Sequence, residues 1–352
     1  MVTATNIKLF DNICNIPSPF EGPHVIGHEK IKNCLLKYLN KEQFSAAFLF
    51  EGIKGIGKMK LALEFSWNLL NNNLQENWQN IDFNSNLYKQ IYANIYPNLL
   101  YVTRQYNIKQ ENFQQAILIQ DIRNIKKFLY KTSSNNNWRI IIIDSINDLN
   151  YAAENALLKI LEEPPEKTLF ILICHERAGA LDTTRSRCHT FRFLPLTNND
   201  IYLILQQLQL QTFFDYPTNI QQKLLSIANG SVRDIIIFSN DDNLKILETI
   251  DDIFSSSKLN FNKIMLLINK LFEENNLLKY NLAINYLKYI LNIRAKKYIQ
   301  INNLTQADLI SKLWFKLQQN ILNTNIYNLD KKQTILLTIE EIHNCFYNIK
   351  NY

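Results

Sequence analysis

The sequence predicts an α/β domain followed by an all-helical half, and three observations support this division. Short apolar runs alternate with helical patterns between about residues 24 and 194. A glycine-rich turn follows the first of these runs, and after Pro195 only helical periodicity remains. Alternation of this kind is typical of a parallel sheet with helices on both faces.

The predicted strands are short and nearly all apolar, as expected for strands that are covered on both faces. They occupy residues 46–50, 99–102, 140–143 and 169–173. Three segments with apolar residues at i, i+3 and i+4 are predicted helices: 60–70, 121–130 and 152–161. The Asn-rich segment 71–86 is predicted to be a loop.

The second half of the chain is predicted to be helical throughout. Its periodic stretches are 200–210, 221–228, 229–239, 244–254, 261–299 and 306–347. One boundary is expected near 194–197 and a softer one near 240–243. The predicted domains are therefore 1–195, 196–242 and 243–352.

Composition and charge exclude several classes of protein. With 352 residues, 47% of them hydrophobic, and only 7 Gly and 8 Pro, the chain is expected to be globular with more than one domain. The net charge of +6 is spread along the chain, which is compatible with nucleic acid nearby but does not show it.

Targeting and cysteine patterns predict a cytoplasmic protein. No stretch approaches 18 apolar residues, and Met1 to Asn6 do not begin a signal peptide. The five cysteines form no C-x-x-C pair, so neither a disulfide framework nor a metal site is expected. Residues 59–143 contain no cysteine, so structural zinc is not predicted.

A candidate phosphate-binding loop follows the first predicted strand and opens a helix. Its pattern is Gly52-x-x-Gly55-x-Gly57-Lys58. Glycines allow backbone N–H groups to converge on an anion, and Lys58 could reach the outer phosphates of a nucleotide. An ordinary strand-to-helix turn with Gly and Lys is the competing interpretation.

The strand at 140–143 ends in Asp144, where a phosphate-loop protein places the carboxylate that holds Mg²⁺. An apolar strand that ends in Asp is common, so this signal depends on the loop.

Two groups that an ATPase of this kind would need are missing. The residue after Lys58 is Met59 instead of Ser or Thr, and Ser145 replaces the Glu that polarises water in ATPases. A thioether is a poor ligand for a hard cation, so the hydrolytic machinery is predicted to be degraded.

Further motifs carry a family resemblance. They are the segment 155–159 with Leu161-Glu162-Glu163-Pro164-Pro165, and Ser186-Arg187-Cys188. With these motifs the sequence resembles the bacterial DNA polymerase III clamp-loader subunits of the AAA+ group, from residues 25–29 to 228–233. The resemblance implies an AAA+ core with a parallel sheet, a small helical lid and a C-terminal helical collar.

The resemblance also implies roles for single residues. Arg187 would be an arginine finger that acts in trans on the ATP site of a neighbouring subunit. Without the motif, Arg187 would be read as a surface arginine paired with a carboxylate. Arg233 matches the second sensor, and it could touch phosphate or only hold the lid. His175, at the first-sensor position, is expected to be structural.

The implied role requires no cofactor, and whether the loop binds ATP or ADP weakly is left open. The implied partners are gamma or tau and delta subunits in a hetero-pentamer, with the sliding clamp and primed DNA reached through the complex. The chain would be a non-hydrolysing component of the DNA polymerase III holoenzyme. The alternatives are a gamma- or tau-type motor ATPase, or a DNA-binding scaffold with a strong salt dependence of binding.

Overall fold

The computed structural model describes most of the chain. The described residues are 10, 12–13, 16–21, 24–39, 46–71, 78, 81–107, 111–130, 138–175, 182–273 and 277–350. The segment Met1 to Asn6 and half of the predicted loop 71–86 lie outside them, and Asn86 begins a helix. The chain forms two compact units, one of residues 1–210 with 230–233 and one of residues 211–229 with 234–352. The predicted division into three domains stays a prediction.

Unit 1 contains a five-stranded parallel sheet of order β2-β5-β6-β1-β7. The strands are β1 (Ala47–Glu51), β2 (Leu99–Val102), β5 (Arg139–Asp144), β6 (Thr168–Cys174) and β7 (His189–Arg192). A short antiparallel pair, β3 (Tyr106–Asn107) and β4 (Asn112–Phe113), lies outside this sheet. All four predicted strands are confirmed. The edge strand β7 was not predicted, because only Phe191 of its four residues is buried.

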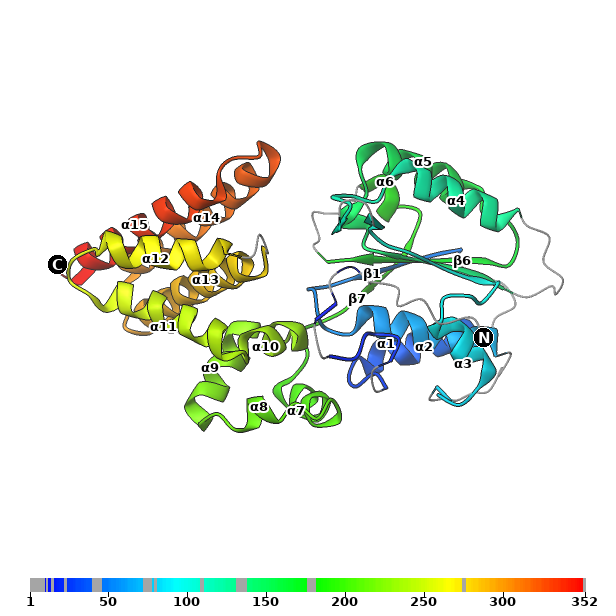
Figure 1. The fold of residues 1–352 in the computed structure, drawn as a ribbon, viewed down its shortest axis with the longest axis horizontal. Coiled ribbons are helices and arrows are strands. Elements are labelled where there is room, and N and C mark those ends of the chain that lie inside the picture. Colours follow the sequence, from blue (N-terminus) through cyan, green and yellow to red (C-terminus); the bar gives the residue numbers. More distant parts are fainter. Residues whose placement is uncertain are drawn as a thin grey trace. The chain divides into compact units, whose positions relative to one another are not determined.

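Helices cover both faces of the sheet, as Figure 1 shows. On one face lie α1 (Glu29–Leu39), α2 (Lys58–Leu70) and α3 (Asn86–Tyr92), and on the other lie α4 (Ile119–Leu129), α5 (Tyr151–Glu162) and α6 (Asp182–Arg185). A single 3-10 turn (Ile146–Asp148) follows β5, and α7 (Asn198–Gln207) follows β7. The three predicted helices of this half are confirmed, and every residue of α2 is buried.

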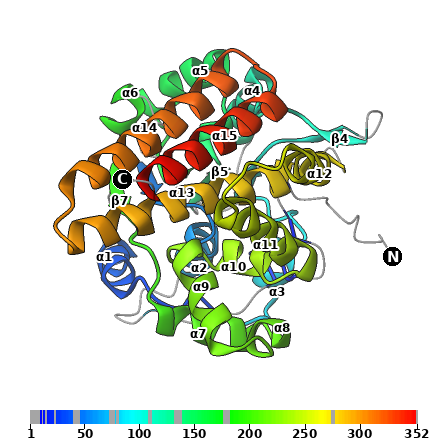
Figure 2. The same ribbon diagram turned by 90° about the vertical axis from the view of Figure 1, so that its left-hand side faces the viewer.

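All of the regular secondary structure in the described part of unit 2 is helical. Its helices are α8 (Gln211–Phe214), α9 (Thr218–Ala228), most of α10 (Val232–Phe238), α11 (Asp241–Ser255), α12 (Phe261–Phe272), α13 (Leu277–Gln300), α14 (Leu304–Ile326) and α15 (Lys331–Lys350). Helices α13, α14 and α15 lie side by side (Figure 2). The predicted stretches 261–299 and 306–347 are each divided into two helices, and the second division contains Asn328, whose φ of 51° ends a helix.

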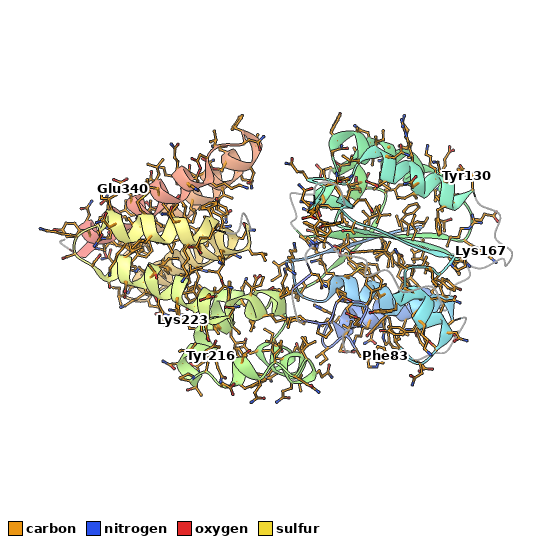
Figure 3. The ribbon with its side chains drawn as sticks, in the orientation of Figure 1. Phe83, Tyr130, Lys167, Tyr216, Lys223 and Glu340 are labelled. Carbon is orange, nitrogen blue, oxygen red and sulfur yellow. The ribbon has the colours of Figure 1, made fainter. Side chains whose placement is uncertain are left out.

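The parallel register brings the carboxyl ends of three central strands together. Glu51 pairs with Cys174, and Asp144 pairs with Ile173. The amino ends of the strands lie at the opposite end of the sheet. Tyr130, after α4, and Lys167, before β6, lie at this end of unit 1 (Figure 3). Loops that follow β1, β5 and β6 therefore meet at one edge, which is where open α/β sheets form ligand sites.

The sheet and its helices form a continuous apolar core. Fully buried members include Ile141, Ile143, Phe170 and Leu172 from the sheet and Leu157 from α5. Aliphatic side chains of this kind hold the strands rigidly beneath the loops at the carboxyl edge. Among the described residues, no helix has the length and apolar character that a membrane crossing needs.

Candidate functional site

The glycine-rich loop joins β1 to α2, which is the strand–loop–helix context that the pattern predicts. Gly55 and Gly57 adopt φ of 80° and 92°, in the left-handed region that glycine enters without strain. Gly57 is the residue that precedes α2, and α2 begins at Lys58. The predicted loop residues Gly52, Gly55, Gly57 and Lys58 therefore form one turn at the carboxyl end of the sheet.

The side chain of Lys58 is turned back onto its own loop. Its Nζ donates to the carbonyl oxygens of Gly52 at 2.6 Å and Ile53 at 2.5 Å, and the residue is only 3% exposed. Burial lowers the pKa of Lys58 to about 8, against the opposing effect of the Asp144 carboxylate. The ammonium group is thus bonded by the loop itself, at the place where a nucleotide phosphate would need it.

The loop is also fixed by segments from outside it. The backbone N–H groups of Val232 and Arg233 approach the carbonyl oxygen of Gly55 at 3.0 and 3.4 Å. A Cβ at Gly55 would lie 2.4 Å from the Cβ of Arg233, so only glycine fits this approach. The ring Nε2 of His28 lies 2.8 Å from the carbonyl oxygen of Ile56. The structure therefore brings the predicted residue Arg233 to the phosphate loop.

Asp144 lies beside the loop at the end of β5. Its Oδ1 is 3.6 Å from His175 Nε2, and its Oδ2 accepts a 3.4 Å hydrogen bond from the hydroxyl of Tyr101. Burial raises the pKa of Asp144 to about 6, although the positive charges of Lys54 and Lys58 oppose this shift. The carboxylate and the loop lysine thus lie close enough to influence each other.

His175 has the features of a structural residue. Burial and the charges of Lys58, Lys54 and Arg233 lower its pKa to about 2, so its ring is neutral near pH 7. Its backbone N–H donates to Asn147 Oδ1 at 2.8 Å. A ring that stays neutral through the physiological range cannot deliver a proton there.

The two positions that depart from the ATPase pattern are occupied by structural side chains. Met59 belongs to the buried core and is 7% exposed. The hydroxyl of Ser145 donates to Asp148 Oδ2 at 2.8 Å, and Asp148 also pairs with Arg104. A buried thioether and a hydroxyl engaged in this way offer neither a Mg²⁺ ligand nor a general base. The residues present do not fit a hydrolytic Mg²⁺–nucleotide site.

Sequence reasoning missed Lys54, Arg104 and Asp148 near this site. Only Asp148 had a local signal, because Ser145 and Asp148 have the spacing of a capping box, which the 3-10 turn uses. Arg104 lies 44 residues from its partner Asp148, so no local pattern connects them. Among the described residues, no cluster of three or more His, Cys, Asp or Glu side chains is arranged to hold a metal ion.

Arg187 makes none of its hydrogen bonds to the phosphate loop. Its guanidinium donates to Glu162 Oε1 at 2.6 Å, to the carbonyl oxygen of Thr183 at 2.8 Å and to Ser186 Oγ at 3.4 Å. The side chains of Arg187 and Glu162 are 33% and 50% exposed. The structure therefore separates Arg187 from the other predicted site residues and leaves it accessible at the surface.

The sheet register places β7 relative to the loop. His189 begins β7 level with Phe48, whereas the phosphate loop starts after Glu51. Three residue spacings along a strand, about 10 Å, separate these two levels. The partner Glu162 ends α5, the helix that leads back to the amino end of β6.

The environment of Asp144 predicts a pH dependence of stability. An Asp in an unfolded chain has a pKa near 3.9, and the folded value is about 6, so between these values the folded state keeps a proton that the unfolded state loses. The free energy of unfolding should fall as pH rises from 4 to 6, on the order of 2 kcal/mol more than in Asp144→Asn. Denaturant unfolding at pH 4, 5, 6 and 7 measures this difference, and parallel profiles for the two proteins would contradict it.

The parallel sheet and the glycine-rich loop between β1 and α2 have the arrangement of a phosphate-loop protein. Residues 27–197 match the family model described as DNA polymerase III, delta subunit. Over much of this segment the chain is also similar to proteins named as subunits of bacterial DNA polymerase III.

The relatives include proteins named as gamma subunits and proteins named as delta' subunits. DNA polymerase III subunit gamma of Buchnera aphidicola subsp. Schizaphis graminum is 32% identical over 34% of this chain and 32% of its own length. Subunit delta' of the same organism is 31% identical over 47% of this chain and 48% of its own length. The chain thus spans about half or less of these curated relatives. A solved gamma subunit-related protein from Thermotoga maritima covers 90% of this chain and 99% of its own, with 15% identity and a TM-score of 0.41.

Proposed function

We propose that this chain acts as a delta-prime type stator of a DNA polymerase III clamp loader, with no ATP hydrolysis of its own. The observation that carries the proposal is the state of Lys58, whose ammonium is bonded to the loop carbonyl oxygens of Gly52 and Ile53. Two of the three N–H groups of the ammonium are thus engaged, and Met59 and Ser145 would offer a bound nucleotide no hydrolytic chemistry. Bound nucleotide is not required for the proposed role.

In this proposal Arg187 supplies its guanidinium to the triphosphate of a neighbouring subunit. The planar, permanently charged fork suits a phosphoryl group that gains negative charge in the transition state. Exposed ion pairs contribute about 0–1 kcal/mol, so the contact with Glu162 can be exchanged for a phosphate at little cost. Arg233 would serve the chain's own lid, because its backbone already contacts Gly55.

The proposed complex contains gamma or tau and delta subunits, and acts on the sliding clamp and primed DNA. An exposed apolar face of α14 supports assembly through unit 2. Its members lie 11, 7 and 4 residues apart on one side of the helix and are Leu304, Phe315, Leu322 and Ile326. Exposed apolar stripes of this kind mark protein interfaces, so we assign residues 243–352 to the collar.

ATP turnover by the isolated chain tests the proposal. We expect no turnover above background, because the loop lysine is engaged and neither a Mg²⁺ hydroxyl nor a general base is present. The measurement is release of inorganic phosphate at saturating ATP and Mg²⁺, and Lys58→Ala should give the same background. Turnover on the order of 1 s⁻¹ that Lys58→Ala abolishes would instead identify a gamma- or tau-type motor.

A further inference from the structure

A second arginine lies two residues before Arg187 in the same short segment. The Nη2 atom of Arg185 is 3.4 Å from Oε2 of Glu51, the last residue of β1 and the residue directly before Gly52. We propose that Arg185 is a positioning residue, which fixes Arg187 by anchoring the α6 segment to the central sheet. This inference rests on the proposed function and adds the device that holds the arginine finger in place.

The two arginines differ in the exposure of their ion pairs. The side chains of Arg185 and Glu51 are 25% and 9% exposed, whereas both members of the Arg187–Glu162 pair are a third or more exposed. Salt and water screen a buried pair much less than an exposed one, and losing one partner leaves an uncompensated buried charge. The less exposed Arg185–Glu51 pair, at 3.4 Å, is therefore screened less than the more exposed Arg187–Glu162 pair, at 2.6 Å.

The base of this attachment is rigid. The carbonyl oxygen of Glu51 accepts a 2.7 Å hydrogen bond from the backbone N–H of Phe193, and the next residue, Gly52, donates to the carbonyl oxygen of Cys174 at 3.2 Å. The peptide group between Glu51 and Gly52 is thus hydrogen-bonded to both neighbouring strands or their extensions. The carboxylate of Glu51 has a defined position from which it can orient Arg185.

The segment between the two arginines is short and hydrogen-bonded. The backbone N–H of Arg187 donates to the carbonyl oxygen of Thr184 at 3.2 Å. The backbone N–H of Cys188 donates to the carbonyl oxygen of Arg185 at 3.3 Å. Thr184 is buried, at 1% exposure. Because this turn fixes the spacing between Arg185 and Arg187, holding the first also restricts the second. The α6 helix has only four residues, and the ion pair with Glu51 adds an attachment to the sheet.

The test uses the complete complex of this chain with its gamma-type partner, delta, clamp and primed DNA. Arg185→Met keeps an unbranched side chain, shorter than that of Arg, and removes the charge. It should lower kcat for ATP by 10- to 100-fold, as misplacement of a catalytic group by about 1 Å does, and should leave co-purification of the subunits unchanged. Arg185→Lys should restore most of kcat because it keeps the charge. Arg192→Met is the matched control, since Arg192 is exposed on the neighbouring strand at the level of Glu51, and it should leave kcat unchanged.

The outcomes separate this inference from the proposed function. A normal kcat for Arg185→Met in a complex where Arg187→Ala has lost activity would overturn the positioning role alone. A normal kcat for Arg187→Ala would overturn the arginine finger itself, and the positioning role with it. If Arg185→Met fails to fold, the pair Glu51→Leu with Arg185→Met removes both buried charges together. A folded complex of this double variant should show the same low kcat, and a normal kcat would refute the attachment.

Discussion

Replacing Arg187 by Ala is expected to lower ATP turnover at the neighbouring site by about 10³-fold, the lower end of the range known for arginine fingers. The reason is that a guanidinium stabilises the charge that develops on the transferred phosphoryl group. The measurement uses a complex in which only the motor subunit that receives Arg187 keeps its phosphate-loop lysine. ATP turnover then comes from that one site alone. Clamp and primed DNA are present in excess.

Two control variants make this result specific. Arg187→Lys keeps the positive charge but loses the planar fork, so we expect only partial turnover. Arg192→Ala removes an exposed arginine of β7 and should leave turnover unchanged. If Arg187→Ala and Arg192→Ala gave the same rate in an intact complex, Arg187 would have no role in trans.

Phe48→Ala is expected to destabilise unit 1 by about 3–5 kcal/mol, the usual cost of removing a buried aromatic ring. Phe48 lies on β1 and is fully buried. Its ring centroid is 5.1 Å from Tyr38, 5.8 Å from Phe65 and 5.2 Å from Phe191, so it joins α1, α2 and β7 to the sheet. Guanidinium unfolding followed by circular dichroism would measure the loss.

The matched control for Phe48 is Tyr130→Ala. Tyr130 follows α4 and is 77% exposed, at the end of unit 1 seen in Figure 3. Its removal should change stability by less than about 0.5 kcal/mol. Equal losses for the two variants would show that the ring cluster around Phe48 does not stabilise the sheet.

The sequence predicted the buried strands well because their composition is unambiguous. A run such as Ile140 to Ile143 is apolar on both faces, which is typical of a parallel strand covered on both sides. The strand β7 was not predicted, because it is an edge strand whose His189 and Arg192 are exposed to solvent and interrupt the apolar run. The division between α14 and α15 was not predicted either, since Asn328 is a weaker helix stop than Gly or Pro.

In the candidate site, too, features set by neighbouring residues in the sequence could be predicted, whereas contacts between distant residues could not. The spacing of Gly52, Gly57 and Lys58 is local, so the loop and the helix after it could be predicted. The direction of the Lys58 side chain could not, because it depends on which acceptors lie nearest in space. Likewise Arg187 was a candidate from its motif, but its partner Glu162 is 25 residues away and joins it only through the fold.

The placement of Arg187 has a consequence for the geometry of assembly. Its guanidinium and the phosphate loop occupy different parts of the surface of unit 1. If one subunit's guanidinium enters the next subunit's loop, the contact is heterologous, and repetition of it produces a head-to-tail series with a polarity. In such a series a member whose own loop receives no guanidinium can occupy only a terminal place, and a closed assembly built from the series would then lack rotational symmetry.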